Sequence, residues 1–107
     1  MKLRFSIQYS TKWGENVWVV VKAHVSTGVM KTYRLCLLTD DGEHWTAELA
    51  VMESRHSVFT FFEYEYQIRG GDDVVRRREW HVVPRIIPCD NSHDFVMNDE
   101  WKDIPLM

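Results

Sequence analysis

The chain has 107 residues, 45% of them hydrophobic and 27% charged, and this length and composition predict one globular domain rather than a disordered segment. The net charge of −3 at pH 7 disfavours nucleic acid or an anionic membrane as the main partner. No apolar run approaches the roughly 20 residues that a membrane-spanning helix needs. Five tryptophans are more than a core of this size usually holds, which gives a first indication of function.

In the first half of the chain, apolar and polar residues alternate, and this period of two predicts β-strands. The first strand is expected at residues 2–9, where every second residue is large and apolar. A polar loop follows at 10–15 and carries Trp13. Three further strands are separated by turns rich in Gly, Ser, Thr and Asp, and they are expected at 16–25, 30–39 and 44–52.

A hairpin is predicted at the centre of the second half. Aromatic and β-branched residues alternate along a strand at 58–69, and the Gly-Gly-Asp-Asp sequence at 70–73 suits a tight turn. A return strand is expected at 74–83. Short strands then follow at 85–87 and 95–97, with a polar loop at 90–94 between them.

The pairing within this hairpin assigns its side chains to two faces. Glu63 and Glu65 are expected on the charged, solvent-facing side, opposite two of three residues of the return strand: Arg76, Arg78 and Trp80. Arg77 and Glu79 fall on the apolar side. The return strand is therefore expected to be an edge of the sheet, or to face a gap.

Together these elements predict an all-β fold. No window shows the 3.6-residue period of an amphipathic helix, and turn signals recur every eight to twelve residues. The prediction is an antiparallel β-sandwich of seven to eight strands, immunoglobulin-like, or else a small barrel, formed by residues 1–107 as a single domain.

The cysteines and histidines give no sign of a metal or redox centre. No signal-peptide pattern precedes the first strand, so we expect a cytoplasmic protein in which Cys36 and Cys89 are reduced and mostly buried; a disulfide is the alternative. The five histidines lack metal-ligand spacing. The loop at 90–94 could hold calcium, but it lacks the glycine and the final glutamate of a strong calcium loop. We expect no metal and no cofactor.

Four motifs follow one another along the chain: T-K-W-G-E-N at 11–16, a tryptophan near the start of a strand at Trp45, F-E-Y-E-Y at 62–66 and D-E-W-K at 99–102. In this order they resemble the starch-binding domain, carbohydrate-binding module family 20. That family has a T-x-[aromatic]-G-E-N loop, an F-E-Y-K-F strand and a closing D-x-W-[RK] motif. Its aromatic-Glu hairpin partner corresponds to Glu79-Trp80, and the resemblance covers about residues 3–103.

The resemblance implies a first sugar site on the loop aromatic residue and the tryptophan of the middle strand. In this chain the two rings are those of Trp13 and Trp45. Glu15, or a nearby carbonyl group, would provide a polar contact at the rim. The motif around this site matches the family well.

A second site of the family uses two tryptophans, a strand lysine and a downstream asparagine. In this chain only Trp80 matches a residue of that set. Glu65 occupies the position of the lysine, and Arg85 lies near the position of the asparagine. The family's L-G-x-W loop is absent. The second site is therefore expected to be altered or lost.

The resemblance further implies a non-catalytic module at the N-terminus of an amylomaltase-type bacterial 4-α-glucanotransferase. Its partners would be an α-1,4-glucan or maltooligosaccharide and a catalytic domain in the same longer chain. The alternative is a β-sandwich that serves protein–protein or interdomain docking. Catalysis by this domain is the weakest reading, because glycoside hydrolysis needs carboxyl groups across a cleft, and a small sandwich offers little cleft.

Overall fold

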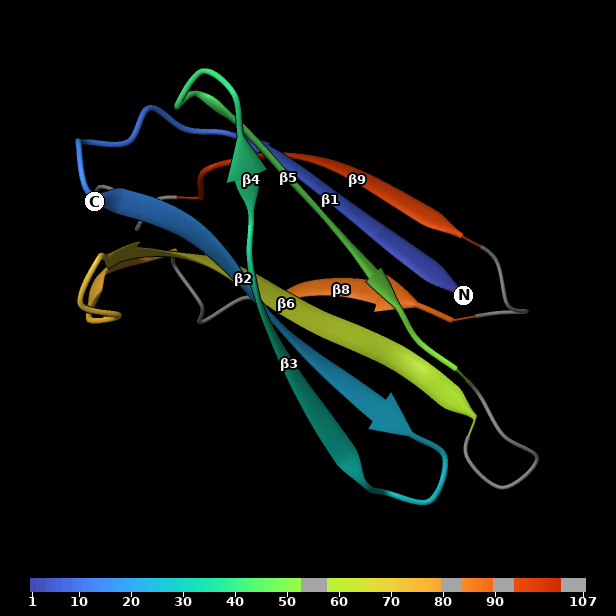
Figure 1. Ribbon diagram of the computed structural model, residues 1–107. Helices are drawn as coiled ribbons and strands as arrows, with labels where there is room; N and C mark the ends of the chain where they lie inside the picture. The colour runs from blue at the N-terminus through green and yellow to red at the C-terminus, as the bar shows by residue number, and fades with distance from the viewer. Residues whose placement is uncertain (53–57, 80–83, 90–93, 103–107) are drawn as a thin grey trace, which may run out of the picture.

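The computed structural model describes residues 1–52, 58–79, 84–89 and 94–102, which form two packed β-sheets (Figure 1). The all-β sandwich expected from the sequence is confirmed. Among these residues, no helix is long and apolar enough to cross a membrane. The strands are β1 (Lys2–Gln8), β2 (Glu15–Val25), β3 (Met30–Cys36), β4 (Leu38–Thr39), β5 (His44–Ala50), β6 (Phe59–Gly70), β7 (Val75–Arg78), β8 (Arg85–Pro88) and β9 (Phe95–Glu100).

The first sheet has the strand order β4-β5-β1-β9 and forms the upper layer in Figure 1. β1 pairs with β5 in antiparallel orientation, with Phe5 opposite Ala47. On its other side β1 pairs with β9 in parallel orientation, with Phe5 opposite Met97. The first and last described strands thus lie side by side, and their parallel pairing departs from the antiparallel pairing expected throughout.

The second sheet has the order β3-β2-β6, and both β7 and β8 pair with the remaining edge of β6. β7 pairs with β6 between Gln67 and Arg69, whereas β8 pairs with it between Phe61 and Tyr64. The ladder is therefore interrupted where β6 passes from one partner to the other. The exposed strand β7 lies at the edge of the sheet, as the charges on its apolar side predicted.

The core lies between the sheets and follows the alternation read from the sequence. In β1, Leu3, Phe5 and Ile7 are buried, while the residues between them face outward. The ring of Phe5 meets those of Tyr64 and Tyr66 edge-on, with centroids 5.1 and 6.5 Å apart. Burying a side chain of this size stabilises the fold by about 1.5–3 kcal/mol relative to leaving it exposed.

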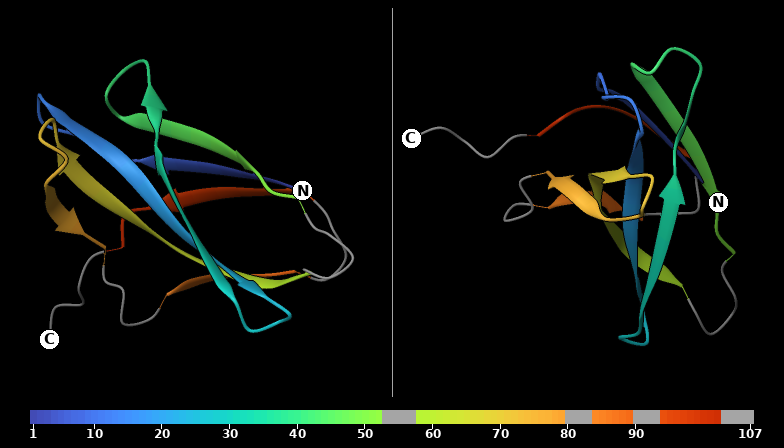
Figure 2. Two further views of the ribbon diagram at one scale, coloured as in Figure 1. Left: turned by 60° about the horizontal axis from the view of Figure 1, so that its bottom comes forward. Right: turned by 60° about the vertical axis from the view of Figure 1, so that its left-hand side comes forward.

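The chain crosses between the sheets at Leu37, which accounts for a ninth strand. The sequence predicted one strand at 30–39, but β3 belongs to the second sheet and β4 to the first (Figure 2). Leu37 is buried at this crossing, and its N–H donates to the carbonyl of Val17 at 2.9 Å. Cys36, on the other side of the strand, is exposed, so its expected burial is wrong.

Candidate functional site

Trp13 stands at the tip of a tight turn that begins at Lys12. The turn closes with the N–H of Glu15 donating to the carbonyl of Lys12 at 3.0 Å, and Gly14 adopts a φ of 82°. This places Trp13 at the second position of a type II turn, whose third position requires positive φ and so favours glycine. The Trp13 side chain has a relative exposure of 101%, so its ring is bare to solvent.

Glu15 fixes this turn. Its Oε1 accepts the backbone N–H of Lys12 at 2.9 Å, across the base of the turn. The carboxylate expected to contact sugar thus has a structural role first: it helps to hold the backbone from which the Trp13 ring projects.

The loop that carries Trp13 is anchored to the turn between β4 and β5. The N–H of Tyr9 donates to the carbonyl of Glu43 at 2.8 Å, and that of Thr11 donates to the carbonyl of Gly42 at 3.2 Å. These hydrogen bonds join two loops at the same end of the sandwich. The Trp13 ring is consequently presented by an anchored loop.

Asp41 organises the turn to which this loop is anchored. Its Oδ1 accepts hydrogen bonds from the backbone N–H groups of Glu43 and His44, each at 2.8 Å, and from the Thr39 hydroxyl at 3.2 Å. Its Oδ2 lies 2.7 Å from Nδ1 of His44. The hydrogen bond from the His44 side chain, with those from the backbone, holds the pKa of Asp41 well below its usual range, and the same pair raises the pKa of His44.

A shallow surface pocket lies beside this turn. Its walls combine an exposed apolar side chain, that of Leu38, with short polar and charged groups. The lining residues are Leu38, Thr39, Asp40, Asp41, His44 and Thr46. Sequence reasoning did not identify this pocket, because β4 has only two residues and its side chains carry no motif.

Trp45 does not form the second exposed ring that was predicted. Its side chain is 3% exposed, and its Nε1–H donates to the carbonyl of Tyr9 at 3.1 Å. The ring points into the core because Trp45 pairs with Ile7, whose side chain is also buried. The expected platform of these two rings is therefore wrong in this structure: Trp45 supports the base of the loop, and of the two rings only that of Trp13 is exposed.

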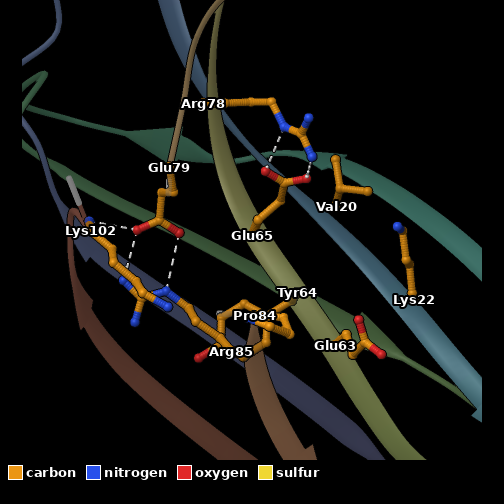
Figure 3. Close-up of a pocket in the computed structure, with 10 residues that line it drawn as sticks. All are labelled: Val20, Lys22, Glu63, Tyr64, Glu65, Arg78, Glu79, Pro84, Arg85 and Lys102. Carbon is orange, nitrogen blue, oxygen red and sulfur yellow. Dashed lines mark hydrogen bonds and ion pairs between the residues drawn. The ribbon is translucent and has the colours of Figure 1, made fainter. Parts of the chain in front are cut away.

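Glu65 and Arg85, which were assigned to the second site, line a pocket at the interruption between β7 and β8 (Figure 3). Glu65 forms a two-pronged ion pair with Arg78, at 2.9 and 2.7 Å, and this hydrogen bonding raises the pKa of Arg78. Trp80, the third residue assigned to this site, lies outside the described residues. The pocket thus gathers two of the three predicted residues, and both already have charged partners.

Glu79, whose position on the apolar side was noted in the sequence, is the buried centre of this region, with an exposure of 2%. Its Oε1 accepts the backbone N–H of Tyr66 at 3.0 Å, at the point where the β-ladder is interrupted. Both of its oxygens accept from Arg85, at 3.1 and 2.8 Å, and Oε2 also accepts the N–H of Lys102 at 2.7 Å. The carboxylate therefore replaces missing strand contacts.

Asp99 extends the network into the core. Its Oδ2 accepts the hydroxyls of Tyr64 and Tyr66, at 2.8 and 2.7 Å, and its Oδ1 lies 3.2 Å from Arg85. Burial, together with the Asp99 charge, raises the pKa of both tyrosines. This network closes the edge of the sandwich, and the motif containing Asp99 gave no sign that it would do so.

Two other tryptophans pack against arginines. The guanidinium of Arg69 lies 4.8 Å from the centre of the half-buried Trp18 ring. Trp101 is also half-buried, with Tyr9 at 4.8 Å between ring centres and Arg77 at 5.2 Å. Both tryptophans thus pack against neighbouring side chains.

Asp41, Glu43 and His44 are grouped closely enough to suggest a metal site. All three are exposed, and both carboxylate oxygens of Asp41 already accept hydrogen bonds within the turn. These contacts give the cluster a structural role in shaping the turn.

No protein-family model matches the chain, and no curated protein matches it in sequence. Its fold is similar to part of the glycoside hydrolase family 15 glucoamylase from Hypocrea jecorina, with a TM-score of 0.62, 16% identity and 95% of this chain covered. It is also similar to part of the gamma-CGTase from alkalophilic Bacillus clarkii, with a TM-score of 0.59, 14% identity and 94% coverage. A third match is the Hormoconis resinae glucoamylase, with a TM-score of 0.56, 20% identity and 96% coverage.

The chain spans only 15–17% of the length of these three proteins. At such identities the likeness shows a shared fold and nothing finer. The molecule is therefore a β-sandwich similar in fold to segments of two glucoamylases and a CGTase, and among the tryptophans that the structure describes only Trp13 is fully exposed.

Proposed function

We propose that this chain is a non-catalytic α-glucan-binding module of the starch-binding type, carbohydrate-binding module family 20. The observation that carries the proposal is the fully exposed ring of Trp13 at the tip of an anchored turn. A bare indole costs free energy in water, so its position at a loop tip favours a role in binding. The fold shared with segments of two glucoamylases and a CGTase supports the same class.

The chemistry of glucose suits such a ring. One face of an α-glucose unit presents mainly C–H groups, which pack on an aromatic face, while the hydroxyls at the rim reach polar groups. By analogy with base stacking, one such contact contributes about 1–3 kcal/mol. With the polar contacts at the rim added and the cost of association subtracted, we expect a weak affinity, of roughly millimolar order.

The binding surface consists of Trp13 together with the pocket beside the turn between β4 and β5. Leu38 supplies an exposed apolar surface there, with an exposure of 76%, and Asp40 and Thr46 supply polar groups. Because the two loops are joined through Thr11 and Gly42, one oligosaccharide can contact both. The charged groups of Glu65 and Arg85, which line the second pocket, are already ion-paired, and we assign no sugar to that pocket.

In its wider context, the module would tether a 4-α-glucanotransferase of amylomaltase type to maltodextrin in the cytoplasm. A catalytic domain in the same longer chain would perform the glycosyl transfer, and residues 1–107 would act as one binding domain. The small share of each structural neighbour that the chain covers supports a modular role. Weak binding suffices for tethering, because many sites on a polymer act together.

The test is a titration of the purified chain with maltoheptaose, followed by calorimetry in every variant and also by tryptophan fluorescence in the wild type. We expect quenching in the wild type, most of that affinity in Trp13→Phe, and a loss of about 1–3 kcal/mol of binding free energy in Trp13→Ala. Cellohexaose is the control, because its flat chain should fit a curved glucan site poorly. Equal affinities of the wild type and Trp13→Ala would refute the proposal.

Interdomain or protein–protein docking is the second candidate. Exposed apolar side chains outside the sugar surface favour it, among them Met52 at 90%, Val96 at 60% and Ile86 at 55% exposure. Light scattering of the isolated chain separates the two functions. A dimer that forms without glucan, combined with no binding of maltoheptaose, would favour docking.

A further inference from the structure

His44 lies at the start of β5 and lines the pocket beside the turn, with its side chain 64% exposed. Its Nδ1 lies 2.7 Å from Oδ2 of Asp41. The other ring nitrogen, Nε2, makes no hydrogen bond to the residues that the structure describes. One nitrogen of this imidazole is thus fixed by the turn, and the other faces the pocket or solvent.

The ionised carboxylate of Asp41 decides which nitrogen titrates. A carboxylate only accepts hydrogen bonds, so Nδ1 of His44 must carry a proton whether the ring is charged or neutral. The proton that the ring gains and loses near neutral pH is therefore on Nε2. Deprotonation changes Nε2 from an N–H donor into an acceptor, while the contact with Asp41 stays in place.

The surroundings of His44 favour its protonated form. On β1, its cross-strand neighbour is the neutral Gln8, which pairs in turn with Glu100 of β9. Thr46 and Glu48 follow His44 on the same face of β5. Glu48 already forms ion pairs with Lys2 and Arg4. The acidic groups of the adjoining turn are Asp40, Asp41 and Glu43.

We propose that His44 is a sugar-contacting residue whose Nε2–H donates to a hydroxyl of the glucan seated on Trp13, so that glucan affinity falls as pH rises. The proposal rests on the function proposed above and adds a donor to a pocket wall that otherwise includes two carboxylates. His44 is tied to the loop that carries Trp13, because the carbonyl of the preceding residue, Glu43, accepts the N–H of Tyr9 at 2.8 Å.

The direction of the pH dependence follows from the protonation states of His44 and Asp41. Hydrogen bonding to Asp41 raises the pKa of His44 above its ordinary value of 6.5, so the donor is present below that raised pKa and is lost as pH rises through it. The pKa of Asp41 is lowered, so Asp41 stays ionised across the same range. Of this pair, only His44 therefore changes its protonation state at mildly acidic to mildly basic pH.

The test compares maltoheptaose affinities at about pH 6 and about pH 8.5, on either side of the histidine range. We expect the wild type to bind about two- to fivefold more weakly at the higher pH, the size of one exposed polar contact. His44→Gln should bind with no pH dependence. His24→Gln is the matched control, because His24 stacks on Phe61 in the other sheet, and this variant should keep the wild-type pH dependence.

A second readout uses the reciprocity of linked equilibria. If the protonated ring binds glucan better, then saturating maltoheptaose must raise the pKa of His44 measured by NMR. Three outcomes would each overturn the proposed role of His44 and leave the proposed glucan binding in place. They are a pH-independent affinity in the wild type, an unchanged pH dependence in His44→Gln, and a His44 pKa that glucan does not move. Absence of glucan binding at both pH values would overturn the proposed function as well.

Discussion

At the scale of single residues, the most informative group is the carboxylate of Glu79. A buried charge is costly unless it is paired and hydrogen-bonded, and Glu79 receives donors from Tyr66, Arg85 and Lys102. It sits where β6 has lost a strand partner. One side chain therefore supplies the contacts that a continuous strand would otherwise have supplied.

Replacing Glu79 should destabilise the fold strongly. Glu79→Ala leaves the Arg85 guanidinium without its two-pronged partner, and breaking a buried pair in this way costs about 3–5 kcal/mol. Urea denaturation provides the measurement. The control is Glu63→Gln, which removes a more exposed pair with His24 and should cost below about 1 kcal/mol. Similar losses in the two variants would show that the Glu79 network does not support the edge.

Gly14 provides a second prediction at this scale. Its φ of 82° lies in the left-handed region, where an added Cβ costs about 1–2 kcal/mol. We expect Gly14→Ala to lower both the free energy of unfolding, by about 1 kcal/mol, and the affinity for maltoheptaose, because the turn that aims Trp13 would relax. Gly71→Ala is the matched control: a Cβ there would meet its nearest atom at 3.9 Å. Calorimetric unfolding and glucan titration of both variants check this expectation.

At the scale of elements, the passage from β3 to β4 ties the two sheets together. Side chains continue to alternate between the two faces of the chain through Leu37, but the strand with which the chain pairs changes: β3 pairs with β2, and β4 pairs with β5. This switch also places Leu38 on the outer side, where it forms part of the pocket. The same element therefore closes the core and shapes the proposed binding surface.

Two neighbouring leucines test this arrangement. Leu37 is 1% exposed and Leu38 is 76% exposed, so the same truncation should change stability by very different amounts. Leu37→Ala should cost about 2–5 kcal/mol through lost burial and the cavity left behind. Leu38→Ala should change stability by about 0.5 kcal/mol or less. Chemical denaturation of the pair would contradict the described crossing if both variants lost the same stability.

At the scale of the whole molecule, the alternation of apolar residues predicted most of the fold, because each strand has one face on the core and one in water. The pairing of Glu65 with Arg78 and the edge position of β7 followed from the same alternation of side chains between the two faces of a strand. The alternation alone could not predict that β1 would pair with β9 in parallel, since the partner of a strand depends on contacts between distant segments. It also did not show that the strand expected at 30–39 changes sheets at Leu37.

The candidate site was only partly predictable for a related reason. A tryptophan in a polar loop with a following glycine predicts exposure, and Trp13 is exposed. Trp45 lies in a strand, where a shift of one residue decides between core and solvent, and its register with Ile7 turns it inward. The pocket beside it also depends on the outward position of Leu38 where the chain changes sheets, which no local pattern in the sequence encodes.

The most direct test of the account is an NMR titration of the indole N–H resonances with maltoheptaose. The account predicts a large, saturable shift of the Trp13 indole and little change at Trp45, whose Nε1–H stays bonded to the carbonyl of Tyr9. A Trp13 resonance that stays in place while the ligand saturates the protein, or no response of any indole, would contradict it.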